Sequence, residues 1–410
     1  RRPACGNYSS TVSGVGRTLG PMSDTVAAED TAEVSAEQLT RASLSRQVLL
    51  ERVPLAVEEA VRRMVAVQAQ QPESVYVGLA SRLSDFDPAA VDRAFQQRTL
   101  VKATLVRITL HAAHRDDHAT LRVAALPTLR GAAFDKRYFE TGRDPAETDA
   151  LVPALLEFAS SPRTSTELQK WLAEQLDGEG HSRVWRALRA IAPLVHEPAG
   201  GGWSFGQRPA YRAAADTAGP VRATAEQCAA ALREVVPRYL AAFGPASVAD
   251  IAQFALVQRS RVKDAVRALG DRLVTLRGPD GVVLYDVPGG RIPAPDEPAP
   301  PRLLPMWDNL LLAYADRSRV IPPEFRQVVT RVNGDVLPTL LVDGKVAGVW
   351  RVLDGTVEAT AFRPLTRSAW RGLAAEAERL MQLLGDREPA MFQRYHHWWR
   401  RLPDGEVRIL

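Results

Sequence analysis

Hydrophobic and polar positions repeat in one order through the middle of the chain: three helical stretches, then two short strands. Between residues 150 and 211, the pattern predicts these elements at Leu151–Ser160, Thr164–Leu172, Ser182–Ile191, Leu194–His196 and Trp203–Phe205. Thr164 and Glu167 have the spacing of a capping box, which satisfies free N–H groups where a helix begins. Val184, Leu188 and Ile191 lie at i, i+4 and i+7, the spacing of a buried helix face. Three helices followed by a hairpin is the order of a winged helix-turn-helix module.

Two further stretches have the same order. The copy near the N-terminus is predicted at Leu55–Val67, Val75–Leu83, Pro88–Gln97 and the hairpin Leu100–His111, and a helix at Glu37–Glu51 precedes it. The other copy is predicted at Thr224–Phe243, a short helix opened by Ser247 and Asp250, Ser260–Leu269, and strands Leu273–Arg277 and Val282–Val287. Similar architecture at three places is a repeat signal, although the three sequences are not alike.

The chain after Ala299 has a different pattern. It predicts strands at Leu310–Tyr314, Leu337–Val342, Val346–Leu353 and Val357–Phe362, with hairpin turns at Asp343-Gly344 and Asp354-Gly355, and a helix at Ser368–Leu384. We therefore predict a mainly α fold with β-hairpin wings (α+β), made of tandem winged helix-turn-helix modules and a C-terminal α+β domain. The predicted parts are a disordered tail at 1–35, winged-helix units at 36–148, 149–222 and 223–290, and the C-terminal domain at 291–410.

Composition narrows the class of protein. No stretch approaches the roughly 18 apolar residues that a membrane helix needs, and two cysteines exclude a disulfide scaffold. The 52 basic residues exceed the 48 acidic ones, giving +4, and only five of them are lysine. Arginine makes bidentate contacts with phosphate and guanine, which favours DNA binding. A net charge this small also fits a chain that is simply arginine-rich in composition. Winged helices can also serve as modules that bind other proteins.

The sequence contains no nucleophile–base pair, phosphate-binding loop or dinucleotide-binding fingerprint. Gly200-Gly201-Gly202 lacks the Lys-Ser/Thr of a phosphate-binding loop. His111, His114 and His118 have no cysteine or fourth ligand nearby, so we expect structural or DNA-facing histidines, with no metal and no cofactor.

The stretch Gln68-Ala69-Gln70-Gln71-Pro72 is more informative. Continuing the helical face Val57, Val61, Met64 and Val65 by one step places Gln68 on an apolar stripe, where an unpaired amide costs about 1–3 kcal/mol. Pro72 is expected to end that helix, which would let Gln68 and Gln70 converge. The residues alone favour the simpler interpretation, in which Gln68 satisfies loose carbonyls at the helix end.

Several short segments, in order, resemble one bacterial family. They are Leu39–Leu50, Gln68–Pro72, Tyr76–Leu79, Thr109–His111, Asp308–Leu312, Asp316–Val320, Val342–Gly344 and Gly348–Trp350. The chain is similar, from about Ala36 to Leu384, to the winged-helix family that contains the AlkZ and YcaQ DNA glycosylases. The resemblance implies a concave DNA channel and excision of alkylated purines. It also implies catalysis by Gln68 and Gln70, because Gln-x-Gln is the signature of the AlkZ-like branch and Gln-x-Asp that of the YcaQ-like branch.

The resemblance thus predicts a DNA glycosylase acting on double-stranded DNA with N7-alkylguanine, including interstrand crosslinks from azinomycin-type bis-alkylators, in antibiotic self-resistance. Of the five lysines, only Lys102 falls in the unit with the glutamines, on a hairpin where phosphate contact is expected, so we predict a monofunctional enzyme.

The alternative is a winged-helix transcription regulator without catalysis, which usually dimerises. A chain with several modules and no coiled coil is expected to be a monomer, and lack of a signal-peptide core predicts a cytoplasmic, nucleoid-associated protein.

The expected DNA contacts are basic or polar residues on helix faces, hairpins and the C-terminal segment. They are Lys102, Arg107, His111, Arg183, Arg186, Arg261, Lys263, Arg267, Arg317 and Arg319. Arg261, Lys263 and Arg267 lie off the apolar line of their helix, so they are expected to face solvent and DNA.

Overall fold

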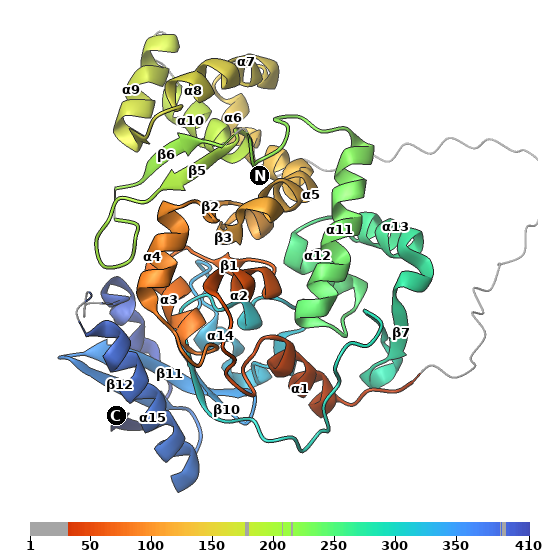
Figure 1. The fold of residues 1–410 in the computed structure, drawn as a ribbon, viewed down its shortest axis with the longest axis vertical. Helices are drawn as coiled ribbons and strands as arrows, with labels where there is room; N and C mark the ends of the chain where they lie inside the picture. Colours follow the sequence, from red (N-terminus) through yellow and green to blue (C-terminus); the bar gives the residue numbers. More distant parts are fainter. Residues whose placement is uncertain (1–31, 177–179, 207, 215, 386, 388–390) are drawn as a thin grey trace, which may run out of the picture. The chain divides into compact units, whose positions relative to one another are not determined.

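The computed structural model describes residues 32–410 apart from 177–179, 207, 215, 386 and 388–390 (Figure 1). Residues 1–31 of the predicted tail lie outside the described residues. Residues 32–35 belong to the fold: Glu33 bridges Arg277, Val34 is buried, and Ser35 caps the first helix. Along the described residues, no helix is long and apolar enough to cross a membrane.

The first part of the fold has the predicted helices and hairpin, plus one strand that was not predicted. Its elements are α1 (Ala36–Arg46), α2 (Val57–Arg63), β1 (Val67–Gln68), α3 (Pro72–Ala80), α4 (Pro88–Gln96), β2 (Leu100–Thr104) and β3 (Leu110–His114). Strands β2 and β3 pair antiparallel as predicted. Helix α1 ends at Arg46 rather than Glu51, because Val48 has a φ of 58°, outside helical geometry. Strand β1 pairs with the other edge of β3.

The second part joins the same sheet. After α5 (Arg115–Ala133), its elements are α6 (Lys136–Phe139), α7 (Pro145–Ala150), α8 (Val152–Phe158), β4 (Arg163–Thr164), α9 (Ser165–Gln175), α10 (His181–Ile191), β5 (Leu194–Glu197) and β6 (Ala210–Ala213). The capping box of Thr164 and Glu167 is confirmed. Because Lys102 of β2 pairs with His196 of β5, the two hairpins form one six-stranded sheet, in the order β1-β3-β2-β5-β6-β4.

The prediction of a strand at Trp203–Phe205 is wrong. Ser204 has a φ of 60°, so the chain is not extended there, and β6 forms later, at Ala210–Ala213. Trp203 instead packs edge-on against Tyr76 of α3, and Phe205 packs edge-on against Phe95 of α4. In Figure 1 the loop between β5 and β6 extends toward α4. Aromatic packing therefore fixes this loop against the first part of the fold.

The third part matches its prediction closely. It contains α11 (Ala225–Phe243), α12 (Val248–Ala255), α13 (Arg259–Leu269) and the hairpin of β7 (Val274–Arg277) and β8 (Val283–Asp286). A capping box of Ser247 and Asp250 begins α12.

The C-terminal part is a five-stranded antiparallel sheet with a long helix. Its elements are β9 (Arg302–Leu304), α14 (Arg326–Val329), β10 (Thr339–Val342), β11 (Lys345–Leu353), β12 (Thr356–Ala361), α15 (Arg367–Leu384) and β13 (Glu406–Ile409), with strand order β13-β12-β11-β10-β9. At the β10–β11 turn, Asp343 and Gly344 both have positive φ, 52° and 76°, as the predicted hairpin turn requires. The strand predicted at Leu310–Tyr314 is wrong: Asn309–Leu311 form a 3-10 turn capped by the Asp308 carboxylate.

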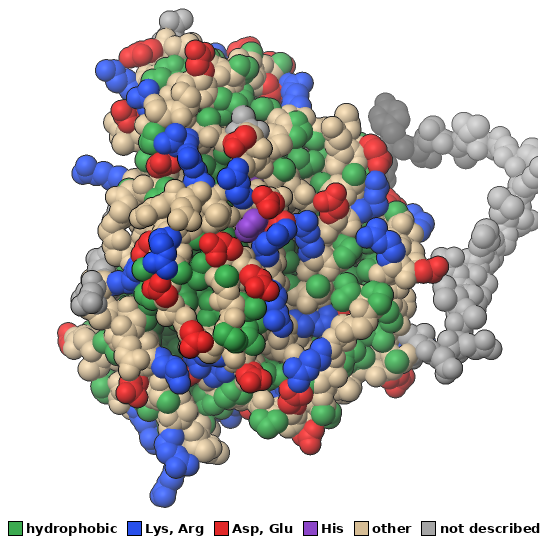
Figure 2. Space-filling model, viewed as in Figure 1, with side chains coloured by type: hydrophobic (Ala, Val, Ile, Leu, Met, Phe, Trp, Pro, Cys, Tyr) green, Lys and Arg blue, Asp and Glu red, His purple; other side chains and the backbone are tan. Residues whose placement is uncertain are grey.

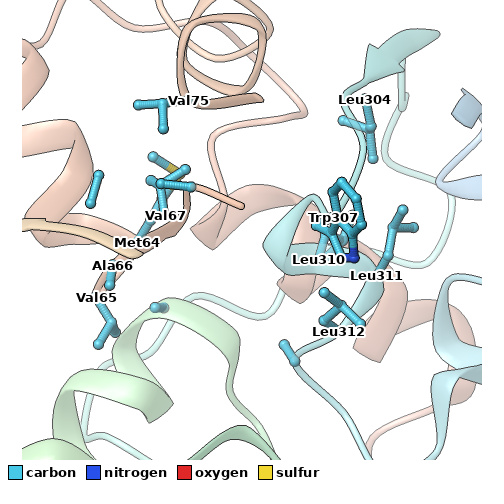
Figure 3. Close-up of a cluster of buried hydrophobic side chains, with 14 of the residues drawn as sticks. Met64, Val65, Ala66, Val67, Val75, Leu304, Trp307, Leu310, Leu311 and Leu312 are labelled. Carbon is cyan, nitrogen blue, oxygen red and sulfur yellow. The ribbon is translucent and has the colours of Figure 1, made fainter. Parts of the chain in front are cut away.

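Buried side chains tie the first, third and C-terminal parts into one hydrophobic cluster, whereas most of the second part has its own cluster. Figure 3 shows one region of the larger cluster, with Met64–Val67 on one side and Trp307 and Leu310–Leu312 on the other. This packing holds the segment that carries Gln68 against the C-terminal part of the chain.

Candidate active site

Gln68 lies on a strand rather than on a helix. Helix α2 ends at Arg63, and Val65 has a φ of 69°, so the apolar stripe of α2 does not extend to Gln68. Pro72 is the first residue of α3 and does not mark the end of α2. The fixed φ of proline suits the first position of a helix, and the backbone of Gln71 before it is extended. The predicted helix end at Gln68–Pro72 is therefore wrong, although Gln68 is buried as expected, with 4% of its surface exposed.

Strand β1 ends at Gln68, backbone pairing continues one residue further to Ala69, and the chain bends at Gln70. Gln68 pairs with His111 across β1 and β3, and the Ala69 amide continues this ladder by donating to the Leu110 carbonyl at 2.8 Å. Gln68 is buried and Gln70 is exposed, so one amide lies deep and the other at the surface.

Gln68, Arg107 and His111 form a hydrogen-bond network. The Arg107 Nη2 lies 3.0 Å from the Gln68 Oε1 and 3.0 Å from the His111 Nε2. The His111 Nδ1 lies 3.0 Å from the Thr109 carbonyl, which only accepts, so Nδ1 carries the proton and Nε2 accepts from Arg107. Burial, reinforced by the charge of Arg107, holds the pKa of His111 well below its usual range. His111 is therefore neutral and fully buried.

Arg107 is a cation held by neutral partners. Its hydrogen-bond partners among the described residues are Gln68 and His111, neither of them a carboxylate, and its Nη1 is buried without a hydrogen-bond partner there. Burial lowers the pKa of its guanidinium to about 10, and the charge of Arg317 acts in the same direction. The guanidinium carbon lies 5.2 Å from the centre of the Phe254 ring on α12. Arg107 thus links the strand of Gln68 to the third part of the fold.

A cavity of about 590 Å³ opens beside Gln70. Its lining includes Gln70, Glu73, Lys102, Arg189 and Arg394, but not Gln68, Arg107 or His111. Burial lowers the pKa of Lys102 to about 8, and its ammonium lies 4.5 Å from the centre of the Phe205 ring. Burial also raises the pKa of the Glu73 carboxyl. The predicted residues that share this cavity are thus Gln70 and Lys102.

These findings can be set beside proteins of known function. Residues 61–383 match the family described as DNA glycosylase AlkZ-like. The chain belongs to the AlkZ-like DNA glycosylase family. It is 26% identical over 370 residues to an interstrand DNA cross-link repair glycosylase of Streptomyces sahachiroi, covering 83% of this chain and 94% of that protein. The fold matches the solved structure of the Streptomyces sahachiroi DNA glycosylase AlkZ with a TM-score of 0.73 and 23% identity, covering 86% of this chain and 97% of that one.

Membership of the AlkZ-like family makes the chain an enzyme, a DNA glycosylase, so the alternative of a transcription regulator is wrong. The structure also gives a role to Asn309, which lies in the family segment Asp308–Leu312. The Asn309 side-chain oxygen accepts from the Gln68 backbone N–H at 3.3 Å, and its Nδ2 donates to the Ala66 carbonyl. Sequence analysis included Asn309 in the family segment Asp308–Leu312 and gave it no role. Its contacts join residues more than 240 positions apart, so no local pattern reveals them.

The other expected DNA contacts lie away from this cavity's lining. Arg183 and Arg186 are on α10, where Arg183 lies near Glu140 and Arg186 lies near Asp135. Arg261, Lys263 and Arg267 are on α13, and of these Lys263 and Arg267 are exposed. Arg317 and Arg319 lie on a 3-10 turn. Arg317 donates to the Thr330 hydroxyl, and Arg319 donates to the Pro245 carbonyl. Figure 2 shows basic and acidic side chains interspersed on one face of the molecule.

The histidines do not gather into a metal site. His111 is engaged as above, and the Nδ1 of buried His118 lies 3.4 Å from the Thr217 hydroxyl. Within residues 32–410, gaps excepted, no three His, Cys, Asp or Glu side chains are grouped to hold a metal ion.

Proposed function

We propose that this family member is a monofunctional DNA glycosylase that hydrolyses the N-glycosidic bond of N7-alkylguanine in double-stranded DNA. The observation that carries the proposal is the placement of the Gln-x-Gln motif: Gln70 lines the cavity, and Gln68, two residues before it, is held on β1 by Arg107 and Asn309. No strong base is required, because N7 alkylation already gives the guanine a positive charge and makes it a good leaving group.

The reaction needs only an aligned water. As the C1′–N9 bond breaks, its electron pair goes to the base and neutralises the N7 cation, while the sugar gains oxocarbenium character. The water oxygen bonds to C1′, and the proton released passes to solvent. A glutamine amide holds the water by hydrogen bonds but does not keep a full proton, so alignment is its contribution. Uncharged bases should therefore react slowly or not at all.

The relative's activity suggests the wider substrate. Because that protein is named an interstrand cross-link repair glycosylase, we extend the proposal to N7-linked crosslinks, including those from azinomycin-type bis-alkylators. Three helices followed by a hairpin recur in the structure, and we propose that these are winged helices along a concave DNA channel. In this proposal the basic residues of α10, α13 and the 317–319 turn contact phosphates, and a monomer acts on the nucleoid.

The test is release of an abasic site from a defined lesion. A duplex with one N7-methylguanine is incubated with the full chain, and one half of each sample is then heated in alkali and resolved on a denaturing gel. We expect cleavage at the lesion after alkali and an intact strand without it. No cleavage above the enzyme-free control would refute the proposed activity. The same gel with an N7-linked crosslink tests the extension.

A further inference from the structure

The contact between Arg107 and Gln68 fixes which end of the Gln68 amide is free. A guanidinium has five N–H donors and no acceptor, so the amide atom 3.0 Å from the Arg107 Nη2 must be the oxygen. The opposite orientation would place the amide NH2 against a cation. The amide nitrogen, Nε2, therefore points away from Arg107. It has no hydrogen-bond partner among the described residues.

Arg107 is itself held in a way that maintains this orientation. Its Nη2 also donates to the neutral His111, whose other nitrogen is committed to the Thr109 carbonyl. His111 lies directly across the β1–β3 ladder from Gln68, so backbone pairing sets the spacing of both acceptors. Stacking on Phe254 restrains the guanidinium from the other side. The side chain therefore presents its donors to the Gln68 oxygen in one arrangement.

We propose that Arg107 is a positioning residue that makes Gln68 a hydrogen-bond donor in the active site, and that Gln70 supplies the acceptor. This inference rests on the glycosylase function proposed above. The two glutamines then have different parts: the Gln68 Nε2 donates to the attacking water, and the Gln70 Oε1 accepts from it. Equal roles for the two amides would not predict this division.

The division suits a water nucleophile. Water has two lone pairs and two O–H groups. One lone pair must face C1′, the Gln68 Nε2 occupies the other, and one O–H donates to the Gln70 Oε1, which orients the first lone pair. The new O–C1′ bond forms as the C1′–N9 pair leaves with the base, and the released proton goes to solvent. An acceptor position also tolerates a carboxylate, whereas a donor position does not.

Carboxylate substitution distinguishes the two glutamines. Gln68→Glu keeps an oxygen for Arg107 but removes the Nε2 donor, and Gln70→Glu keeps an acceptor. In single-turnover excision of N7-methylguanine, we expect Gln68→Glu to lose on the order of 100-fold in rate and Gln70→Glu to stay within about tenfold of wild type. Gln382→Glu, an exposed site on α15, is the charge control and should match wild type. Retained activity in Gln68→Glu would overturn the donor role.

A double-mutant cycle tests whether Arg107 acts through Gln68. Arg107→Met should slow excision by roughly tenfold while the DNA Kd stays unchanged, and Arg107→Lys should recover part of the rate. In a Gln68→Ala background, Arg107→Met should have no further effect on the rate. Arg371→Met, on the exposed face of α15, is the matched control. An equal loss in both backgrounds, or a parallel loss of DNA binding, would contradict the positioning role.

These results separate two kinds of failure. If wild-type chain releases no base, the proposed function fails. If wild type is active but Gln68→Glu is equally active, the function stands and the assignment of donor and acceptor fails.

Discussion

Arg82 and Asp308 form a buried bidentate ion pair between positions far apart in the sequence. The Arg82 Nη1 and Nη2 donate to the two Asp308 oxygens at 2.9 and 2.8 Å, and both side chains are at most 3% exposed. The pair connects the chain after α3 to the turn whose Asn309 contacts the Gln68 backbone. It therefore helps to hold β1 against the C-terminal part.

Breaking this pair should destabilise the fold. Removing one partner leaves a buried charge uncompensated, so we expect Asp308→Ala to lower the free energy of unfolding by about 3–5 kcal/mol. Urea unfolding followed by circular dichroism measures the change. The exposed pair of Arg93 and Asp87 is the control, and Arg93→Ala should cost no more than about 1 kcal/mol. Equal effects of the two substitutions would contradict the structural role of the buried pair.

The glutamine pair should be required for excision but not for binding. Gln68→Ala and Gln70→Ala should each slow release of N7-alkylguanine by on the order of 100-fold, or about 2.7 kcal/mol of barrier, because each removes one contact to the water. Gln70→Asp, which imitates the other branch of the family, should retain substantial activity. Single-turnover rates, DNA affinity and thermal unfolding are measured together. Excision by Gln68→Ala at the wild-type rate would mean that Gln68 is only structural.

The basic face of α13 should bind DNA through phosphates. Replacing Arg261, Lys263 and Arg267 by alanine should weaken binding to random duplex DNA and flatten its salt dependence, because fewer counterions are released. Fluorescence anisotropy at several salt concentrations reports both. Replacing Arg367, Arg371 and Arg379, which are exposed on α15, removes the same number of charges and is the matched control. If affinity is unchanged at every salt concentration, α13 is not part of the interface.

Lys102 should not act as a nucleophile, even though it is suited to be one. Its amine lines the cavity with Gln70, and its pKa of about 8 leaves it mostly neutral at pH 9. The monofunctional mechanism predicts no covalent enzyme–DNA complex on borohydride reduction at pH 7 or pH 9, and no strand cleavage without alkali. A trapped complex that disappears in Lys102→Met would instead reveal lyase chemistry.

The same pKa predicts how stability depends on pH. The folded chain disfavours the charged amine, so between about pH 8 and the unfolded value near 10.5 the unfolded chain binds more protons. Lys102 should therefore make wild type gain stability over this range, and below pH 8 its contribution should be constant. Lys102→Met should remove that gain, as measured by urea unfolding at pH 7, 8, 9 and 10. An identical pH profile in Lys102→Met and wild type would contradict the burial of the amine.

The sequence by itself determined elements whose signals are local. Capping boxes at Thr164 and Ser247, the Asp-Gly turns at 343–344 and 354–355, and the apolar spacing of α10 and α13 each specify a helix start, turn or buried face within a few residues. The ordered family segments also located the glutamine motif, because they depend on residue identity and not on the local fold.

Only the tertiary structure decided how Gln68 is held and which way its amide faces. Strand β1 is two residues long, too short for a period-two pattern, and exists because β3 offers a free edge. Asn309 and Arg107 contact Gln68 across long or irregular stretches of chain. The sheet pairing of Lys102 with His196 likewise joins residues that are far apart in the sequence. Such contacts depend on where backbones meet after packing, and the identity of one residue carries no record of its distant partner.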